Sequence, residues 1–280
     1  MTIKKILLFG STGMLGKYIY TYFIRDTKLN ITVVDINYRV TLDNLNKLED
    51  ILVLNKIDSD TCIINCIGQI PQRTSHDNVS NYYIVNGLFP HLLSKICARY
   101  GAKMIQPTTD CVFSGKKESG NYLESDIHDE INEYGVSKSI GEPFDCTVIR
   151  TSIIGLEIQN KKSFMEWVIN SLKENKIINC WDNHYWNGIT CLEYCKIIEQ
   201  IINKNLFWKG VKHIYSPTTK SKYELAQIIS NTFFTEEYLN NINKSSTNDI
   251  VNKTLSSNST LLFNIPELEI QIKELTFFLF

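Results

Sequence analysis

The chain has 280 residues, which at roughly 150 residues per domain predicts two domains or one large domain with a smaller lobe. Hydrophobic residues make up 43% and charged residues 21% of it, a composition typical of folded globular proteins that excludes disordered and collagen-like chains. With a formal net charge of −1, the protein as a whole has no positive electrostatic field that would attract nucleic acid or an anionic membrane. We therefore expect neither as a partner.

The first half of the chain alternates short apolar runs with amphipathic segments, the rhythm of βαβ units. This rhythm predicts an α/β fold with a Rossmann-type, doubly wound parallel sheet covered by helices on both faces. The expected strands are Lys5–Phe9, Ile31–Asp35, Cys62–Cys66, Lys103–Thr108 and Thr147–Thr151. The expected helices are Leu15–Phe23, Tyr83–Tyr100 and Glu133–Glu142, and Pro90 marks a kink or a later start of the second helix.

The pattern changes after Arg150. Here the expected elements are helices at Phe164–Lys173, Cys191–Ile202 and Tyr223–Phe234 and a strand at Gly210–Tyr215, while the polar stretch Asn240–Ser259 is expected to be a surface connection. We therefore expect a Rossmann-type domain at residues 1–155, whose ligand, NAD(P), is argued from the glycines and Asp35 below. A smaller C-terminal α/β lobe, expected to bind the substrate, lies at residues 156–280, with some segments returning to the first domain.

Three glycines lie between the first expected strand and the first expected helix. Gly10, Gly13 and Gly16 follow the pattern Gly-x-x-Gly-x-x-Gly, and Ser11 and Thr12 add hydroxyl donors. In dinucleotide-binding proteins the first glycine permits a tight turn, the second lets the backbone approach a pyrophosphate, and the third lets the helix pack on the strand. The segment predicts a phosphate-binding turn, and the alternative is a strand-to-helix turn without a ligand.

An acidic residue ends the second expected strand. Asp35 lies 19 residues after Gly16, where a carboxylate accepts hydrogen bonds from the ribose hydroxyls of NAD and repels the 2′-phosphate of NADP. Arg39, four residues later, would partly restore the use of NADP. We expect NADH or NADPH as the cofactor, with a preference for NADH.

Tyr134 and Lys138 lie four residues apart in an expected helix, so their side chains share a face. A nearby ammonium favours the phenolate and lowers the pKa of a tyrosine from about 10, which lets the phenol exchange a proton with a carbonyl oxygen. The same ammonium can hold the nicotinamide ribose. This spacing is common in helices, and it gains meaning because a dinucleotide turn precedes it in the same chain.

Hydroxyl residues close the fourth expected strand. Thr108 and Thr109 lie at its carboxyl end, which is where ligands bind in an open α/β sheet. Thr109 can donate a hydrogen bond to the carbonyl that Tyr134 protonates. The alternative is that these residues only cap the strand.

Several motifs together resemble the extended short-chain dehydrogenase/reductases, and within them the dTDP-4-dehydrorhamnose reductase branch. The motifs are Gly10–Gly16, Thr108–Gly115, Tyr122–Asp126, Tyr134–Lys138 and Gly141–Glu142, followed by Arg150–Ser152, Asn187–Thr190, Gly210–Tyr215, Ser221–Leu225 and Asn252–Ser257. The resemblance covers nearly the whole chain, and the combination is more specific than any single motif.

The resemblance implies NAD(P)H-dependent reduction of the C4 keto group of a nucleotide-linked 4-keto-6-deoxyhexose, a sugar resembling dTDP- or UDP-4-dehydrorhamnose, in activated deoxysugar biosynthesis. Tyr134 would donate the proton, Lys138 would tune it and bind ribose, and Thr109 would orient the keto oxygen. The implied cofactor contacts are Gly10, Ser11, Thr12, Gly13, Met14, Leu15, Gly16, Asp35, Ile36, Cys66, Ile67, Gly68, Tyr134 and Lys138. The implied substrate contacts are Thr109, Asp110, Cys111, Phe164 and Trp186.

Two positions depart from the branch. Cys111 stands where the branch usually has tyrosine, and in this it resembles related bifunctional enzymes that epimerise the keto sugar at C3 or C5 before reducing it. A thiolate there could exchange a proton beside the ketone, and the alternative is that Cys111 only fills space. The segment Cys66–Gly68 stands where the family more often has Asn-Ala-Ala, a change that still leaves room for the cofactor.

Other functions remain open at this point. A non-catalytic NAD(P)-binding regulatory protein would have no chemical need for Thr109, Tyr134 and Lys138. A 4,6-dehydratase normally carries an acidic pair after the catalytic threonine, which Asp110 and Cys111 do not complete. A 4-epimerase would retain its NAD and need no added reductant. The nucleotide, whether dTDP, UDP or GDP, is left open.

The eight cysteines show no Cys-x-x-Cys pair, so we expect reduced thiols, most of them buried, and no metal site. The apolar run Ile6–Phe9 is too short for a signal peptide, and no run reaches the roughly 18 apolar residues of a membrane span, so we expect a cytoplasmic protein. The amphipathic segments Tyr83–Tyr100 and Glu133–Glu142 suggest the face of a homodimer.

Overall fold

The structure is a computed structural model that describes residues 2–71, 79–157, 161–259 and 263–278. The chain divides into two compact units. The first unit comprises Met1–Val112, His128–Arg150 and Cys195–Lys212, and the second comprises Phe113–Ile127, Thr151–Tyr194 and His213–Phe280. A domain boundary at residue 155 stays a prediction.

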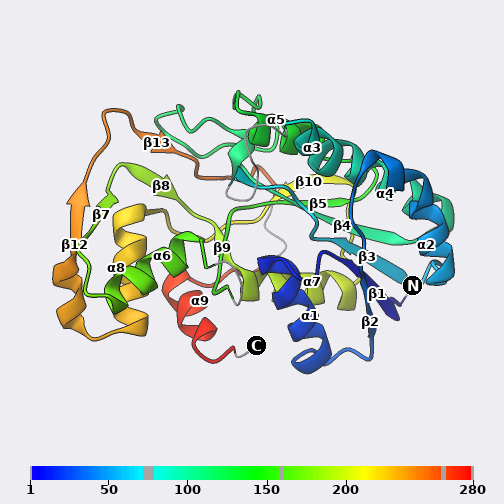
Figure 1. Cartoon of the computed structure of the whole chain (residues 1–280), viewed down its shortest axis with the longest axis horizontal. Coiled ribbons are helices and arrows are strands. Elements are labelled where there is room, and N and C mark those ends of the chain that lie inside the picture. Colours follow the sequence, from blue (N-terminus) through cyan, green and yellow to red (C-terminus); the bar gives the residue numbers. More distant parts are fainter. Residues whose placement is uncertain (1, 72–78, 158–160, 260–262, 279–280) are drawn as a thin grey trace. The chain divides into compact units, whose positions relative to one another are not determined.

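The first unit is built on a six-stranded sheet (Figure 1). From edge to edge its strands are β2 (Thr32–Ile36), β1 (Lys5–Phe9), β3 (Thr61–Asn65), β4 (Lys103–Thr108), β5 (Thr147–Arg150) and β10 (Gly210–His213). Each neighbouring pair from β2 to β5 is parallel, which confirms the predicted Rossmann-type sheet. The strand predicted at Gly210–Tyr215 is shorter than expected and joins the edge of this sheet beside β5.

The order of the strands reverses at β1. The chain runs from β1 to β2 on one side and then returns to β3 on the other side of β1. In open α/β sheets a ligand binds outside the carboxyl ends of the strands at such a reversal. A ligand is therefore expected after Phe9 and Asn65, the last residues of β1 and β3.

Helices cover both faces of the sheet of the first unit. They are α1 (Met14–Arg25), α2 (Leu48–Leu54), α3 (Val79–Tyr82), α4 (Phe89–Tyr100), α5 (Glu133–Ile140) and α7 (Cys191–Asn203), with the 3₁₀ turns η1 (Leu42–Lys47) and η4 (Asp110–Val112). In Figure 1, α1 and α7 lie below the sheet and α2, α4 and α5 lie above it. The predicted helix Tyr83–Tyr100 is divided: η3 (Tyr83–Leu88) is π-helical, and α4 follows with Pro90 in its first turn, where a missing N–H costs little.

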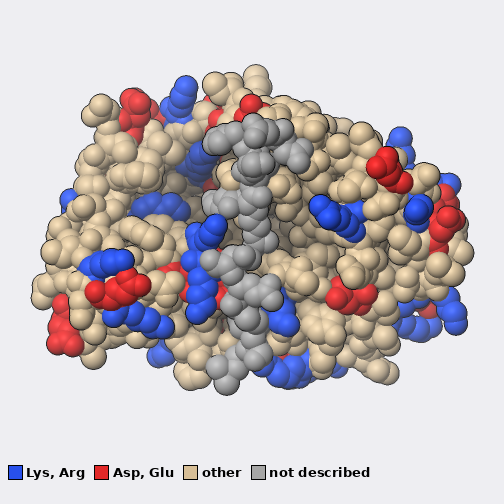
Figure 2. Space-filling view, viewed as in Figure 1, with Lys and Arg blue, Asp and Glu red and all other residues tan. Residues whose placement is uncertain are grey.

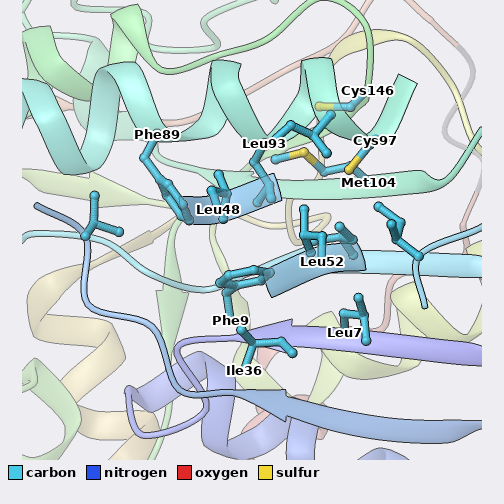
Figure 3. Packing of buried hydrophobic residues seen from close by; sticks show 14 of the residues in the cluster. Leu7, Phe9, Ile36, Leu48, Leu52, Phe89, Leu93, Cys97, Met104 and Cys146 are labelled. Carbon is cyan, nitrogen blue, oxygen red and sulfur yellow. The ribbon is translucent and has the colours of Figure 1, made fainter. Parts of the chain in front are cut away.

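The face of the sheet under α2 and α4 carries the core shown in Figure 3. Alternate residues of the strands, such as Leu7 and Phe9 of β1 and Met104 of β4, point to this face. Leu52 of α2 and Phe89 of α4 pack against them and are fully buried. This packing fixes α4 on the sheet and leaves the carboxyl ends of the strands for the site.

The second unit holds the remaining elements. They are β6 (Ile153–Ile154), α6 (Phe164–Lys173), β7 (Ile178–Trp181), β8 (His184–Trp186), β9 (Ile189–Thr190), β11 (Lys220–Ser221), α8 (Lys222–Phe233), η5 (Glu236–Asn241), β12 (Ile242–Ser245), β13 (Val251–Asn252) and α9 (Leu268–Leu275). The strands form small sheets with the orders β11-β8-β13, β12-β7 and β6-β9.

The prediction of a plain surface connection at Asn240–Ser259 is wrong. Ile242–Ser245 pairs in parallel with β7, and Val251–Asn252 pairs in parallel with β8. The polar composition hides these strands because each is short and gains its hydrogen bonds from a partner more than 60 residues away in sequence.

All eight cysteines are free thiols, and six of them are buried, as expected. Among the described residues, no group of three or more His, Cys, Asp and Glu side chains is arranged to hold a metal ion. No helix in the described part of the chain is long and apolar enough to cross a membrane. On the face seen in Figure 2, acidic and basic side chains are interspersed.

Candidate active site

The glycine turn after β1 has the geometry that a pyrophosphate needs. Gly10 has a φ of +77°, which favours glycine, and a Cβ atom on Gly16 would lie 2.1 Å from the carbonyl oxygen of Gly10. A Cβ atom on Gly13 would meet only that oxygen, at 3.5 Å. Helix α1 begins after Gly13 with no capping side chain and no acidic residue in its first turn, so its N-terminal N–H groups suit an anion.

The turn after β3 lies directly against the glycine turn. A Cβ atom on Gly10 would come within 2.8 Å of the backbone of Cys66 and Ile67. The side chain of Asn65 shapes this turn, because its Oδ1 accepts a hydrogen bond from the N–H of Ile67 at 3.1 Å and its Nδ2 donates one to Gln106 at 2.8 Å. The structure thus brings two predicted cofactor segments together at the reversal point of the sheet.

The predicted cofactor residues differ in which of their atoms a ligand can reach. The side chains of Leu15 and Ile36 are buried, at 8% and 5% exposure, so only their main-chain atoms can face a ligand. Ser11 is also buried, Met14 is half-buried, and Thr12 and Asp35 are exposed. Asp35 is the penultimate residue of β2, so its carboxylate is accessible at the carboxyl end of the sheet.

Thr109 and Tyr134 meet at the carboxyl end of β4. The hydroxyl of Thr109 adjoins the phenol of Tyr134 and lowers its pKa. The hydroxyl of Thr109 also donates to the carboxylate of Asp110 and accepts from the N–H of Cys111, both at 3.1 Å.

Gly135 makes this approach sterically feasible. A Cβ atom at this position would lie 2.4 Å from the carbonyl oxygen of Cys111 and 2.4 Å from Cγ of Glu130. The side chain of Asn132 caps α5 by accepting a hydrogen bond from the N–H of Gly135 at 2.8 Å. The cap and the glycine together hold the first turn of α5, which carries Tyr134, against η4.

Lys138 lies on the side of the site toward β3. Its Nζ would be 3.0 Å from a Cβ atom on Gly68, so the ammonium is next to the turn that the cofactor is expected to contact. Burial lowers the pKa of Lys138 to about 8, although the nearby Cys66, Glu142 and Cys111 favour its charged form. The lysine therefore sits where the sequence places a ribose-binding group.

The prediction that Lys138 lowers the pKa of Tyr134 is wrong for the protein itself. Burial raises the pKa of Tyr134, Cys111 and Asp110 raise it further, and the adjoining hydroxyl of Thr109 lowers it. The ring of Tyr82 packs edge-on against Tyr134 at 6.3 Å between ring centroids. Since a higher pKa holds the proton more firmly, Tyr134 is suited to be a proton donor rather than a resting phenolate.

Cys111 and Asp110 adjoin the pair. Asp110 is buried, and its Oδ1 accepts the hydrogen bond from Thr109 and lies 3.5 Å from the Sγ of Cys111. Cys111 is half-buried. Its thiol thus lies next to a carboxylate, which disfavours the thiolate that proton exchange beside the ketone would need.

Asn86 is a site residue that the sequence analysis missed. Its amide accepts a hydrogen bond from the N–H of Gln69 at 2.8 Å and donates to the carbonyl of Gln69 and to the hydroxyl of Ser137, each at 3.0 Å. It thereby joins the turn after β3 to the helix of Lys138. Asn86 lies in the π-helical η3, and such irregular turns occur often at functional sites, but nothing in the sequence marks the irregularity.

A second buried network supports the same helix. The guanidinium of Arg150, 1% exposed, donates to both carboxylate oxygens of Glu142, at 3.0 and 2.6 Å. It also contacts Nε2 of His128 at 2.7 Å, and Nδ1 of His128 lies 2.5 Å from the hydroxyl of Ser139. Because a guanidinium can only donate, Nε2 is the acceptor and the proton of the neutral ring is on Nδ1.

Phe164 and Trp186, the two predicted aromatic substrate contacts, belong to the second unit. Phe164 opens α6 and is half-buried, and Trp186 ends β8 and is 3% exposed. The Nζ of Lys222 lies 4.9 Å from the centroid of the Phe164 ring and 5.4 Å from that of the Trp186 ring.

Known proteins resemble this chain over most of its length. A dTDP-4-dehydrorhamnose reductase of Aggregatibacter actinomycetemcomitans is 26% identical over 252 residues, which cover 86% of this chain and 83% of the relative. The β subunit of methionine adenosyltransferase 2 of Mus musculus is 22% identical over 245 residues, which cover 82% of this chain and 72% of the relative. The similarity is thus not confined to proteins named as reductases.

Solved structures share the fold. The dTDP-4-dehydrorhamnose reductase of Bacillus anthracis, in complex with NADP, superposes with a TM-score of 0.78 at 18% identity and covers 98% of this chain and 99% of its own. The enzyme of that name from Yersinia enterocolitica has a TM-score of 0.77 at 22% identity, with coverage of 99% and 100%. The family model described as RmlD substrate binding domain matches residues 4–273. The chain therefore belongs to the RmlD substrate-binding domain family.

Proposed function

We propose that the protein is an NAD(P)H-dependent oxidoreductase that reduces the C4 keto group of a nucleotide-linked 4-keto-6-deoxyhexose. The observation that carries the proposal is that the hydroxyl of Thr109 adjoins the phenol of Tyr134 at the carboxyl end of β4, with Lys138 beside the turn after β3 in the same unit. The names of the relatives, and NADP in the neighbour from Bacillus anthracis, support the reaction class and the cofactor class.

Different residues of the chain have different roles in this reaction. A reduced nicotinamide supplies the hydride when it is bound. Tyr134 gives its proton to the keto oxygen as charge develops there. The hydroxyl of Thr109 turns its single proton from Asp110 to the same oxygen and orients it, while the N–H of Cys111 holds Thr109 in place.

Lys138 has a binding role in this scheme. Its position beside Gly68 suits the hydroxyl groups of a ribose that passes over the turn after β3. Asn86 and Ser137 are positioning residues, because they fix the helix of Lys138 to this turn.

The bound pyrophosphate would lie at the glycine turn. Gly13 leaves room for it, and the N–H groups at the start of α1 offer hydrogen bonds. A non-catalytic role, such as that of a subunit, would need this turn but would not need the proton donor Tyr134 or its partner Thr109.

NADH is the proposed preferred reductant. The exposed carboxylate of Asp35 can accept hydrogen bonds from both ribose hydroxyls and would repel a 2′-phosphate. Measurement of kcat/KM with both cofactors, and again in Asp35→Ala, tests this. We expect the wild type to favour NADH and the variant to lose that preference, whereas equal use of NADPH by the wild type would contradict it.

The test of the reaction is a panel of dTDP-, UDP- and GDP-linked 4-keto-6-deoxy sugars, followed by loss of reduced nicotinamide absorbance and by NMR of the product. We expect turnover of at least one dTDP-linked member with a new hydroxyl at C4. Retention of bound NAD with no consumption of added NADH would instead indicate a 4-epimerase, and no turnover of any member would contradict the proposal.

We also propose that two copies of the chain pair through the surface of η3 and α5. Tyr83 and Leu88 of η3 and Ile140 of α5 are 38%, 43% and 52% exposed. These apolar side chains lie on two elements that pack on each other, and a second copy would bury them.

A further inference from the structure

Two histidines hold the last turn of α5. The Nδ1 of His128 lies 2.5 Å from the hydroxyl of Ser139, and the Nε2 of His91, in the first turn of α4, lies 2.6 Å from the carbonyl oxygen of Ile140. The same turn carries Lys138. Because imidazole is the side chain that titrates nearest to neutral pH, protonation of either ring can act on the turn of Lys138.

Protonation has different effects on the contacts of the two rings. A carbonyl oxygen only accepts, so the Nε2 of His91 is a donor, and it stays a donor when the ring is charged. The Nε2 of His128 instead accepts a hydrogen bond from Nη2 of Arg150 at 2.7 Å, and a protonated ring has no acceptor. Protonation therefore keeps the contact of His91 and removes that of His128.

The guanidinium of Arg150 joins His128 to Glu142. Its Nη2 donates to His128 and also to Oε2 of Glu142 at 2.6 Å, while its Nε donates to Oε1 at 3.0 Å. The Nε2 of His128 lies 3.9 Å from Oε2 of Glu142, so a protonated ring repels the guanidinium and attracts the carboxylate. Arg150 and Glu142 are buried, and water screens these forces little. A charge on His128 thus competes with Arg150 for Glu142.

Glu142 connects this network to Lys138. It follows Lys138 by four residues, and its carboxylate is one of the groups that favour the charged form of the lysine. Between them, the N–H of Gly141 donates to the carbonyl oxygens of Ser137 and Lys138 at 3.1 and 3.2 Å. A displacement of Glu142 is therefore transmitted to the turn that places the ammonium beside Gly68.

The charges around His128 set its state. Burial, and then Arg150 of β5, disfavour a charged ring, while Glu142 after α5 and the neighbouring Asp129 favour it. Burial and Arg150 prevail, so the pKa of His128 lies below its ordinary value of 6.5. At neutral pH the ring is therefore an acceptor and Arg150 stays on Glu142, and the competing charge appears only as the pH falls.

We propose that His128 is a positioning residue for the cofactor site, and that its protonation draws Glu142 from Arg150, shifts the last turn of α5 and weakens binding of the nicotinamide dinucleotide. The step adds one proton to Nε2 and breaks its hydrogen bond with Nη2. This inference rests on the proposed function, in that Lys138 binds the cofactor. By linkage, bound cofactor must make His128 harder to protonate by the factor by which the proton weakens binding.

The experiment compares His128→Gln with His91→Gln. Glutamine at position 128 stays uncharged and keeps an oxygen that can accept from Arg150. His91→Gln is a matched control, because it also removes a titratable ring from the last turn of α5 and keeps an N–H donor for the carbonyl of Ile140.

Two measurements are made between pH 7 and 5. Titration calorimetry with NAD⁺ and with NADP⁺ gives Kd for each protein, and the oxidised cofactors are used because the reduced forms decompose in acid. NMR of the ring proton of His128, assigned by its loss in His128→Gln, gives the titration midpoint of this histidine with and without cofactor.

We expect the Kd of the wild type for its preferred cofactor to rise about 5- to 10-fold from pH 7 to 5, in the lower range of coupling between two sites. The Kd of His128→Gln should match the wild type at pH 7 and rise less than about twofold, whereas His91→Gln should follow the wild type. Bound cofactor should lower the midpoint of His128 by about 0.7 to 1 pH unit, which is the same factor expressed as pH.

The inference is overturned if the wild type binds neither cofactor, if its Kd does not depend on pH, or if His128→Gln keeps the full dependence. A midpoint of His128 that cofactor leaves unchanged also overturns it. Turnover of a 4-keto sugar together with any of these results would leave the proposed reductase standing. Binding that weakens in acid only when His128 is present, with no turnover of any 4-keto sugar, would uphold the inference and contradict the reductase.

Discussion

At the scale of single residues, the site depends on which group holds a proton. Tyr134 keeps its proton because burial raises its pKa. The spacing of Tyr134 and Lys138 predicts a shared helix face, but only the packing of α5 shows that Lys138 lies next to Gly68. The roles of these residues stay predictions that substitutions can test.

Replacement of Tyr134 by phenylalanine removes the proton donor and keeps the ring that packs against Tyr82. We expect kcat to fall at least 10²-fold, the usual effect of losing a general acid, with little change in NADH affinity. Steady-state kinetics and a cofactor titration measure the two effects. Unchanged turnover would show that the proton comes from another group.

Cys111 tests whether the protein also epimerises its substrate. We expect Cys111→Ala to retain reduction of the ketone within about threefold, because Thr109, Tyr134 and Lys138 remain. Incubation of the keto sugar with wild type and variant in D₂O without NADH, followed by NMR, measures proton exchange at C3 and C5. Deuterium uptake that disappears in Cys111→Ala would assign an epimerase role to the thiol.

His128 is expected to make the stability of the protein depend on pH. Burial, and then the adjacent Arg150, lower its pKa below the ordinary value of 6.5, while Glu142 and Asp129 oppose the shift. The unfolded chain therefore binds more protons than the folded protein at and below about pH 6.5. The contribution of neutral His128 to the free energy of unfolding is thus complete above that pH and is lost as the pH falls. The contact of Nε2 with Arg150 is the one that protonation breaks.

The variant His128→Gln cannot be protonated. We expect its thermal midpoint to depend less steeply on pH than that of the wild type between pH 7 and 5. Thermal unfolding at several pH values measures this, and equal slopes for the two proteins would exclude His128 as the source.

At the scale of elements, close approaches decide where the site residues meet. α5 contacts η4 through Gly135, and η3 contacts α5 through Asn86 and Gly141, where a Cβ atom on Gly141 would lie 1.7 Å from the carbonyl oxygen of Asn86. The sequence shows the glycines but not their neighbours. The helix of Tyr134 is therefore predictable, while its position on the sheet is not.

Gly135→Ala places a methyl group against the carbonyl of Cys111. We expect a loss of about 1–3 kcal/mol in the free energy of unfolding, as is typical of overpacking, together with a lower kcat as Tyr134 moves from Thr109. Denaturant unfolding and steady-state kinetics measure both.

The control for Gly135→Ala is Glu133→Ala, in the same turn of α5. The side chain of Glu133 is exposed, so its removal should change the free energy of unfolding by less than about 0.5 kcal/mol. Equal stability and activity of the two variants would contradict the close packing of Gly135.

At the scale of the whole molecule, the property to test is the oligomeric state. The pairing through η3 and α5 predicts a particle of twice 32.3 kDa in light scattering after size-exclusion chromatography. Leu88→Asp together with Ile140→Asp places charge on both exposed positions, so we expect that double variant to be monomeric. A wild type of a single chain mass would contradict the pairing.

The sequence by itself determined the features that depend on neighbours along the chain. These are the bounds of β1, β4 and α6, the glycine turn and the shared face of Tyr134 and Lys138, because hydrophobic period and local turn geometry set them. Only the tertiary structure decided the strands β12 and β13, the Asn86 bridge and the direction of the pKa shift of Tyr134. Each of these depends on a partner or on burial supplied by residues distant in sequence, which local patterns do not record.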